Sequence, residues 1–223
     1  MAQGLAQPRT VSEMVQMARS FLERKGCGEA RLESELLVAH ALATTRLGLF
    51  MDLERPVDAA EIDRARDLLV RRGRREPVAY ITGEREFYGR SFRVTREVLI
   101  PRPETELIVD RAREWARSRP EAGERGEGLR VLDWGTGSGC LAITLALELP
   151  ASEVLAVDAF EPTLAVARRN AEDLGAEVQF LKADALAGFE EPSGGRAGFD
   201  LIVSNPPYVG KDELATLAPE VRE

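Results

Sequence analysis

The sequence predicts an α/β protein in which a parallel, doubly wound sheet follows a small N-terminal helical bundle. Two patterns carry this prediction. In the first third of the chain, apolar residues recur at helical spacing. Between residues 129 and 203, short apolar segments alternate with helical ones, which is typical of parallel sheets with helical crossovers. The chain has 223 residues, 44% of them hydrophobic and 30% charged, so it can bury a sizeable core.

Three helices are predicted in the N-terminal part. The first and the third each begin with a capping box, formed by Thr10 with Glu13 and by Asp58 with Glu61. The third helix ends in the basic run 71–75, for which we expect a solvated helix end; docking of an acidic or RNA-associated partner is the alternative. The second helix carries four apolar residues at helical spacing, Leu32, Leu36, Leu37 and Ala41.

After this helical part, apolar residues no longer recur at helical spacing but alternate with polar ones, which predicts a β-hairpin over residues 85–100. Phe92 and Val94 alternate with polar residues after a turn at 88–90. Pro103 then suits the first turn of a further helix. We therefore expect three parts: an N-terminal helical domain at residues 1–84, a hairpin linker at 85–100 and a sheet domain at 101–223.

The sheet domain alternates strands with helices. Four apolar segments predict strands, at 129–132, 154–157, 178–181 and 201–203. Two helices are expected between them, at 141–149 and 162–174, and Gly175 stops the second. Ligands of such sheets bind at the carboxyl ends of the strands, so the residues that follow each strand are the candidates for a site.

A glycine-rich loop follows the first strand of this domain. Its glycines allow a ligand to approach the backbone closely. Cys140 stands where a dinucleotide-binding fingerprint has Gly or Ala, and the chain has no P-loop pattern. These features favour a Rossmann-like class I methyltransferase sheet with S-adenosylmethionine as cofactor; a tight strand-to-helix turn without a ligand is the alternative. The predicted cofactor-binding residues of the loop are Gly135, Thr136, Gly137, Ser138 and Gly139.

Aspartates follow the next two strands. Asp158 is expected to accept hydrogen bonds from both ribose hydroxyls of the cofactor, and a helix N-cap is the alternative role. Asp184 is expected to meet the adenine amino group, with Ala185 as a flat apolar neighbour. For Asp184, an aspartate that only stabilises a turn is the alternative.

The fourth strand is followed by the tetrapeptide Asn205-Pro206-Pro207-Tyr208. Its two prolines make the backbone rigid, so the Pro206 carbonyl and the Asn205 side-chain carbonyl form two acceptors at a fixed separation. Such a pair matches the two hydrogens of a planar –NH2 group, on which Tyr208 can stack and stabilise positive charge as the methyl arrives. The tetrapeptide predicts methylation of a planar amide or amine, with Asn205, Pro206 and Tyr208 as catalytic residues; a proline-rich turn is the alternative.

Charge and cysteine content argue against several classes of protein. Residues 1–100 carry 17 Lys and Arg against 15 Asp and Glu, whereas residues 101–223 carry 13 against 23, and the net charge is −8. An acidic sheet domain argues against non-specific binding of a nucleic-acid backbone. No apolar run approaches the roughly 18 residues of a membrane span. Cys27 and Cys140 have neither metal-site nor disulfide spacing, so we expect no metal and a reduced, cytoplasmic setting.

Five segments resemble the HemK/PrmC family of peptide chain release factor N(5)-glutamine methyltransferases: 75–83, 87–89, 99–106, 133–139 and 205–208. The last is shared with adenine-specific DNA and RNA methyltransferases, whereas Pro101 to Glu106 is far more selective. The resemblance implies methylation of the glutamine side chain in the Gly-Gly-Gln motif of release factors, with an N-terminal helical domain that helps to hold this protein substrate. It also implies that Asn205 and Ala185 contact the cofactor, and that the glutamine contacts Asn205, Pro206, Pro207 and Tyr208.

Two other functions stay open. An amino-methyltransferase that acts on adenine in nucleic acid would need a basic groove, whereas the sheet domain is acidic. A non-catalytic S-adenosylmethionine-binding fragment that docks a translation factor would fit a chain that ends at Glu223, because the family's sheet has further strands, including an antiparallel hairpin. We therefore expect a C-terminally truncated chain, with the fourth strand as an exposed edge.

Overall fold

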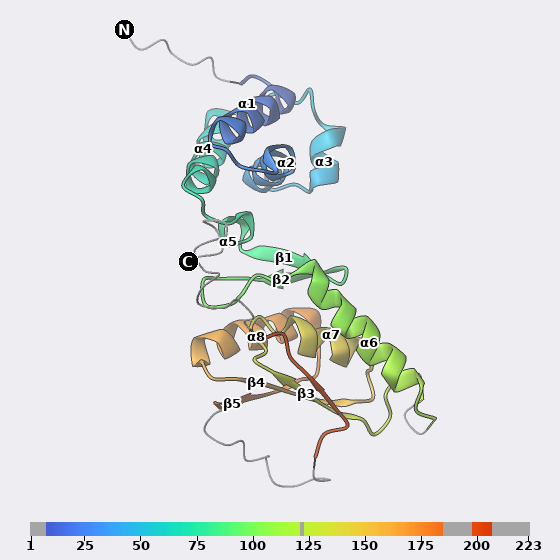
Figure 1. Cartoon of the computed structure of the whole chain (residues 1–223). Coiled ribbons are helices and arrows are strands. Elements are labelled where there is room, and N and C mark those ends of the chain that lie inside the picture. The colour runs from blue at the N-terminus through green and yellow to red at the C-terminus, as the bar shows by residue number, and fades with distance from the viewer. Residues whose placement is uncertain (1–7, 121–122, 185–197, 207–223) are drawn as a thin grey trace. The chain divides into compact units, whose positions relative to one another are not determined.

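The computed structural model describes residues 8–120, 123–184 and 198–206, and these fall into two compact units that divide after Thr82 (Figure 1). The first unit is helical, and the second contains a hairpin and a parallel sheet with helices. An α/β protein with an N-terminal helical region is therefore confirmed. None of the helices in the described ranges is both long and apolar enough to cross a membrane.

The described residues of the first unit form the helices α1 (Val11–Arg24), α2 (Ala30–Ala41), α3 (Arg46–Met51), α4 (Ala59–Gly73) and α5 (Val78–Thr82). The predicted cap of α4 is complete, since Asp58 accepts from the Glu61 backbone and Glu61 accepts from the Asp58 backbone. The cap of α1 is half formed. Thr10 accepts from the Glu13 backbone, but the Glu13 carboxylate accepts from the backbone of Arg9 instead.

The buried face of α2 differs from the expected one. Leu37 is fully buried, but Leu32 and Leu36 remain 39% and 36% exposed. Glu35 is buried in their place, and its carboxylate accepts a hydrogen bond from Arg46 at the start of α3. A charged residue was not expected inside this bundle, and its pairing with an arginine is what makes the burial tolerable.

The expectation of a solvated basic helix end at 71–75 is wrong for Arg72, whereas Arg74 is exposed. Arg72 is buried and pairs with Glu33 at 2.8 Å, and Arg71 pairs with Glu76 at 2.8 Å. Arg75 donates to the backbone carbonyls of residues 25 and 26, just after α1 ends. Arg72 and Arg75 therefore tie the end of α4 to α2 and to the residues after α1, whereas Arg71 pairs locally.

A hairpin opens the second unit and consists of β1 (Glu84–Phe87) and β2 (Arg90–Arg93). Tyr88 and Gly89 form its two-residue turn and have φ of 51° and 70°. Two positive φ values match the turn type whose twist suits a hairpin. Phe87 and Phe92 are fully buried and meet edge to face, with ring centroids 6.0 Å apart.

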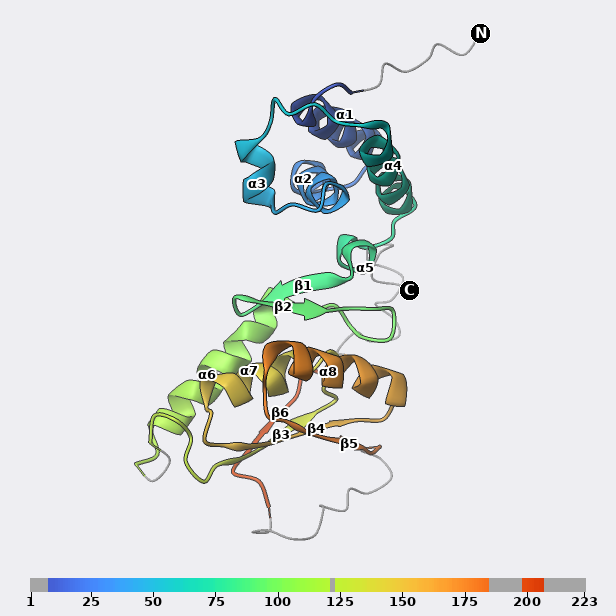
Figure 2. The same ribbon diagram turned by 180° about the vertical axis from the view of Figure 1, so that it is seen from behind.

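The sheet of the second unit has the parallel strand order β5-β4-β3-β6. Its strands are β3 (Arg130–Trp134), β4 (Glu153–Asp158), β5 (Gln179–Lys182) and β6 (Leu201–Val203). The helical elements are η1 (Pro103–Thr105), α6 (Glu106–Arg117), α7 (Cys140–Glu148) and α8 (Glu161–Leu174). The helices α6, α7 and α8 lie on the same face of the sheet (Figure 2).

The direction of the chain across the sheet reverses between β3 and β6. From β3 the chain passes to β4 and then β5, whereas β6 returns to the other side of β3. Loops that follow two such strands diverge and leave a crevice at their carboxyl ends. This topology brings the glycine-rich loop after β3 and Asn205 after β6 to the same pocket.

Candidate active site

A pocket lies at the carboxyl ends of β3 and β6. Three segments that are distant in sequence line it: residues 99–105 before α6, the glycine-rich loop with the start of α7, and Asn205 after β6. The predicted loop residues and Asn205 are thus brought together. The lining residues are Leu99, Ile100, Pro101, Thr105, Gly135, Thr136, Gly137, Ser138, Cys140, Leu141 and Asn205.

The three glycines of the loop have two different structural roles. All three have positive φ, of 73° at Gly135, 58° at Gly137 and 82° at Gly139. A Cβ atom on Gly139 would lie 2.7 Å from the Ile143 side chain and 3.2 Å from that of Ala167, so helix packing requires this glycine. A Cβ on Gly135 or Gly137 would meet nothing within 4 Å. The backbone there faces open space, which fits a ligand that approaches closely.

Asp133 anchors the loop from within the core. Its side chain is completely buried, and Oδ2 accepts hydrogen bonds from the Thr136 hydroxyl at 2.6 Å and the Ala142 backbone at 3.2 Å. Burial raises the pKa of Asp133 to about 6, although these two hydrogen bonds lower it. Sequence reasoning did not assign Asp133 a role, although a carboxylate directly before a glycine-rich loop was the available signal.

Asp158 holds the same loop from the end of β4. One carboxylate oxygen accepts from the Gly137 backbone at 3.1 Å, and the other accepts from the Phe160 backbone at 3.1 Å. The N-cap residue of α8 is Phe160, so Asp158 does not have the alternative role of a helix cap. A carboxylate oxygen can accept more than one hydrogen bond, so the predicted contact with ribose hydroxyls is compatible with this geometry.

Asn205 is positioned by the two segments beside it. Its side-chain nitrogen donates to the Thr105 hydroxyl at 3.1 Å, and the hydroxyl of the preceding Ser204 donates to the Trp134 carbonyl at 2.7 Å. Thr105 is only 4% exposed. Because the amide nitrogen is used as the donor, the carbonyl oxygen lies on the other side of the planar amide group.

The remaining predicted site residues are less constrained. Pro206 is exposed, and Asp184 is exposed two positions after the end of β5. Ala185, Pro207 and Tyr208 lie outside the described residues. Cys140 is buried at the start of α7, and burial raises the pKa of its thiol to about 12. The thiol therefore stays protonated near neutral pH and packs rather than acting as a nucleophile.

The segment Pro101 to Glu106 links three parts of the second unit. Pro101 lines the pocket, and Thr105 holds Asn205. Glu106 accepts from the Tyr88 backbone in the hairpin turn at 2.8 Å. The Tyr88 hydroxyl then donates to Asp110 on α6 at 2.8 Å. The roles of Thr105 and Glu106 were not predicted from sequence, because their partners are remote along the chain.

Comparison with known proteins matches both units. The model of the PrmC N-terminal domain matches residues 13–83, and that of the methyltransferase small domain matches residues 121–220. The release factor glutamine methyltransferase of Chlorobaculum tepidum is 45% identical over 216 residues, which are 96% of this chain and 72% of that protein. Those of Geobacter sulfurreducens and Bacillus anthracis are 42% and 39% identical, cover 96% of this chain, and are covered over 70% and 72% of their own length. The resemblance to the HemK/PrmC family is thereby confirmed, and the chain belongs to the family of release factor glutamine methyltransferases.

Proposed function

We propose that this chain transfers a methyl group from S-adenosylmethionine to the side-chain amide nitrogen of the glutamine in the Gly-Gly-Gln motif of peptide chain release factors. The observation that carries the proposal is the position of the Asn205 amide. Thr105 holds this amide by a hydrogen bond at the carboxyl ends of β3 and β6, in the pocket that the open glycine-rich loop also lines. The site joins a cofactor loop to a fixed acceptor for an –NH2 group. Membership of the family supports the choice of a release factor as substrate.

S-adenosylmethionine supplies a reactive methyl group on its sulfonium sulfur. The open space at Gly135 and Gly137 fits such a ligand, and the chain offers no P-loop for a nucleotide triphosphate. The residues that would hold the cofactor are Gly135, Thr136, Gly137, Ser138, Gly139, Asp158, Asp184, Ala185 and Asn205.

The protein's part in the reaction is positioning. The Asn205 carbonyl oxygen and the Pro206 carbonyl each accept one hydrogen of the substrate –NH2 group. An amide nitrogen is a poor nucleophile because its lone pair is conjugated, and these two bonds raise its electron density and aim it at the methyl group. Pro207 keeps this part of the backbone rigid, and Tyr208 stacks on the flat amide.

The amide proton is lost to water after the transfer. Asp133 is not the base, because its side chain is completely buried and accepts hydrogen bonds from the Thr136 hydroxyl and from the Ala142 backbone in α7. A strong base is not required, since the product nitrogen is acidic while it carries the additional methyl group. The expected contribution of the site is therefore geometry and electrostatics rather than proton abstraction.

We further propose that the N-terminal helical domain helps to hold the release factor, and that the chain acts in the cytoplasm without direct contacts to nucleic acid or membrane. The acidic sheet domain supports this choice over methylation of adenine in nucleic acid. A non-catalytic role is not favoured, because Asn205 and its support by Thr105 are both in place.

The test is methyl transfer from labelled S-adenosylmethionine to two candidate substrates, a release factor and an oligonucleotide that contains adenine. Label on the glutamine of the Gly-Gly-Gln peptide is the expected result, and a release factor with glutamate at that position should stay unlabelled. Label on adenine would overturn the proposal. Cofactor binding without transfer to either substrate would favour the non-catalytic alternative.

A further inference from the structure

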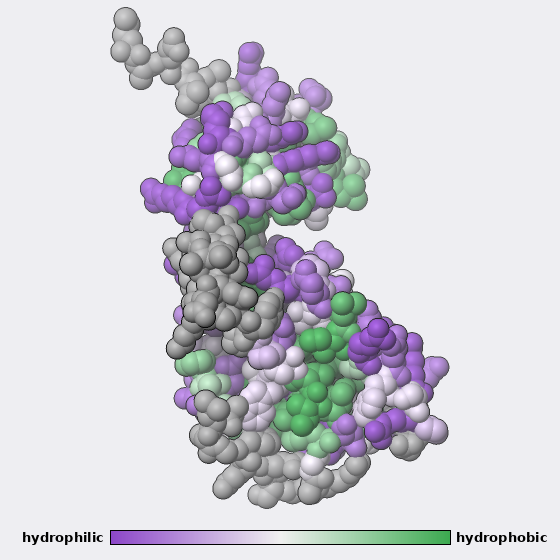
Figure 3. Space-filling model, in the orientation of Figure 1, coloured by the Kyte–Doolittle hydropathy of each residue, from purple (hydrophilic) through white to green (hydrophobic). Residues whose placement is uncertain are grey.

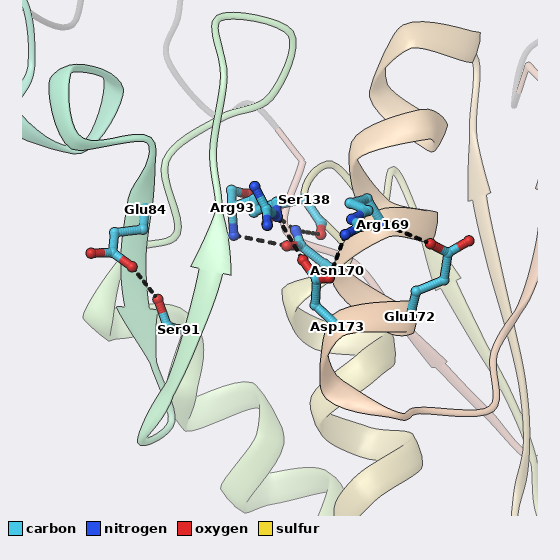
Figure 4. A network of polar contacts seen from close by, with 8 residues as sticks. All are labelled: Glu84, Ser91, Arg93, Ser138, Arg169, Asn170, Glu172 and Asp173. Carbon is cyan, nitrogen blue, oxygen red and sulfur yellow. Dashed lines mark hydrogen bonds and ion pairs between the residues drawn. The ribbon is translucent and has the colours of Figure 1, made fainter.

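Asn170 on α8 is hydrogen-bonded through its amide group to Arg93 of β2 and to Ser138 of the glycine-rich loop (Figure 4). Its side-chain oxygen accepts from the Arg93 backbone at 2.7 Å. Its nitrogen donates to the Arg93 carbonyl at 3.1 Å and to the Ser138 carbonyl at 2.8 Å. The residue is only 1% exposed, so water cannot replace these three hydrogen bonds without a change in packing.

Both segments that Asn170 holds lead directly into the pocket. Ser138 is part of the glycine-rich loop and lines the pocket itself. Arg93 ends β2 and begins the connecting segment, residues 94–101, which ends in the wall formed by Leu99, Ile100 and Pro101. The glycine-rich loop and the start of the segment that leads to residues 99–101 are therefore hydrogen-bonded to the same helix.

A second side chain of α8 holds the connecting segment without contacting the loop. The Thr163 hydroxyl donates to the Glu97 carbonyl at 2.9 Å. Thr163 and Asn170 are seven positions apart, which puts them on one face of the helix, two turns from each other. This face of α8 thus follows the connecting segment, and among the described residues Asn170 is the one that joins the segment to the loop by hydrogen bonds.

We propose that Asn170 is a positioning residue that couples the cofactor loop to the connecting segment, so that occupation of the loop orders the pocket wall of Leu99, Ile100 and Pro101, which lines the same pocket as Asn205. This inference rests on the proposed function for the identity of the two ligands. Its physical basis is that the Asn170 amide group is planar and rigid and is bonded to both Ser138 and Arg93. A shift of Ser138 that carries this amide with it therefore also displaces Arg93. Loss of its donor nitrogen breaks both links to carbonyl groups at once.

The first test is hydrogen exchange of the apoprotein and of its complex with S-adenosylhomocysteine. In the wild type, the ligand should protect amides of residues 135–139 and also those of the connecting segment. Asn170→Asp keeps one acceptor for the Arg93 N–H but replaces the donor by a carboxylate oxygen that faces two carbonyls. In this variant, the ligand should no longer protect the connecting segment. Equal protection in both proteins would overturn the inference.

The second test separates the two walls by binding and kinetics. Asn170→Asp should raise the Kd of S-adenosylhomocysteine and the KM of the release factor about tenfold each, as expected when buried hydrogen bonds are lost. Thr163→Val should raise only the KM of the release factor, because its hydroxyl contacts the connecting segment alone. If Asn170→Asp changes neither constant, or lowers the melting temperature without changing either constant below the transition, the inference is wrong.

Two controls keep the outcome clear. Asp173→Asn removes the partner of the exposed Arg93 side chain, 2.6 Å away, between the same strand and the same helix, and should leave Kd, KM and exchange unchanged. Asn170→Ser is the second variant if Asn170→Asp does not fold, and it should show the same loss of protection. If the wild type transfers no methyl group, the proposed function fails, whereas the exchange test of Asn170 can still be decided.

Discussion

The contact between Asn205 and Thr105 determines which atoms of the site face a substrate. The two residues are 100 positions apart, yet the Asn205 nitrogen lies 3.1 Å from the Thr105 hydroxyl. An asparagine amide can rotate by half a turn at little cost, and then its donor and acceptor exchange places. In the structure the amide nitrogen is the group that faces the buried Thr105 hydroxyl, so this contact fixes the place and the plane of the Asn205 amide.

Thr105→Val should therefore reduce kcat while the fold is preserved. Valine keeps the shape of threonine but removes the hydroxyl, so the Asn205 amide loses the partner that sets its orientation. We expect single-turnover methyl transfer at saturating cofactor to fall by about ten- to a hundredfold. Thr105→Ser keeps the hydroxyl and should retain most of the activity. Full activity of Thr105→Val would show that the contact does not orient Asn205.

Asn205→Ala should abolish methyl transfer without unfolding the protein. The change removes the proposed side-chain acceptor for the substrate, while Ser204 still anchors the end of β6 to Trp134. Circular dichroism and thermal unfolding should match those of the wild type, and transfer of label to a release factor should be undetectable. Unchanged activity would remove Asn205 from the mechanism.

Asp133 should make stability depend on pH in a specific direction. Burial raises the pKa of its carboxyl group to about 6 in the folded state, above its value in the unfolded chain. The folded state then binds more protons between pH 4 and 6, so the contribution of Asp133 to stability falls as pH rises through this window and is constant above it. The expected slope is roughly 1.4 kcal/mol per pH unit.

Denaturant unfolding of wild type and Asp133→Asn at pH 4.5 and pH 7 measures this contribution. The difference between the two proteins cancels the titration of all other groups. We expect the wild type to lose stability relative to the variant as pH rises. Parallel curves would mean that Asp133 titrates in the folded state as it does in the unfolded chain.

In the loop between β3 and α7, different glycines have different roles: one is required by helix packing, and others leave space for a ligand. Gly139 lies against Ile143 of α7 and Ala167 of α8, whereas Gly137 faces open space. The chain passes directly from strand to helix here, since α7 begins at Cys140. The five residues 135–139 thus both allow α7 and α8 to pack closely and leave space for a ligand.

Two alanine substitutions should distinguish the packing role of Gly139 from the ligand space at Gly137. Gly139→Ala forces a close contact in addition to its positive φ, and we expect a loss of about 2–4 kcal/mol of stability. Gly137→Ala should cost about 1 kcal/mol, for its φ alone, but its methyl group would enter the ligand space. Thermal unfolding and calorimetric titration with S-adenosylhomocysteine test both. Equal effects of the two variants on thermal stability and on ligand affinity would contradict these separate roles of Gly139 and Gly137.

The hairpin β1–β2 depends on α6 and α7 for its position. Arg90 pairs with Glu148 at the end of α7 at 2.7 Å, and Arg113 of α6 donates to the Tyr88 hydroxyl at 2.7 Å. Burial and the hydrogen bond to Asp110 raise the pKa of Tyr88. An isolated two-stranded hairpin is marginally stable in water, so these contacts supply the support that a wider sheet would otherwise provide.

On the scale of the whole chain, charge and apolar surface are unevenly distributed. The second unit bears an apolar surface over α6 and β6 (Figure 3), where Leu107 is 64% and Ile202 63% exposed. Residues 101–223 carry 13 basic against 23 acidic residues. A polyanion is repelled by such a region.

The chain should accordingly show no measurable binding to a duplex oligonucleotide at about 0.1 M salt. Fluorescence anisotropy of a labelled duplex is the measurement, and calorimetric binding of S-adenosylhomocysteine to the same preparation is the positive control. Binding that weakens steeply as salt is added would contradict this expectation. It would favour the adenine methyltransferase alternative.

Much of the second unit was predictable because its signals are local. All four predicted strands occur, with ends that differ by at most two residues, since each is an apolar run between polar or glycine-containing segments. Gly175 ends α8 in the left-handed conformation, as expected. The helices α3 and α5 were not predicted, because six and five residues are too few to show a helical period. The basic run was misjudged at Arg72 for a different reason, since its acceptor, Glu33, lies on α2.

The sequence by itself determined the class of fold, the order of the elements, the family, and the residues that follow each strand. These properties depend on hydrophobic period, turn residues and short motifs, which are readable within a few positions. Only the tertiary structure decided that Thr105 holds Asn205, that Asn170 joins Arg93 to Ser138, and that Asp133 is buried beneath the loop. These contacts depend on strand order and helix packing, because they join residues that only the folded sheet brings together.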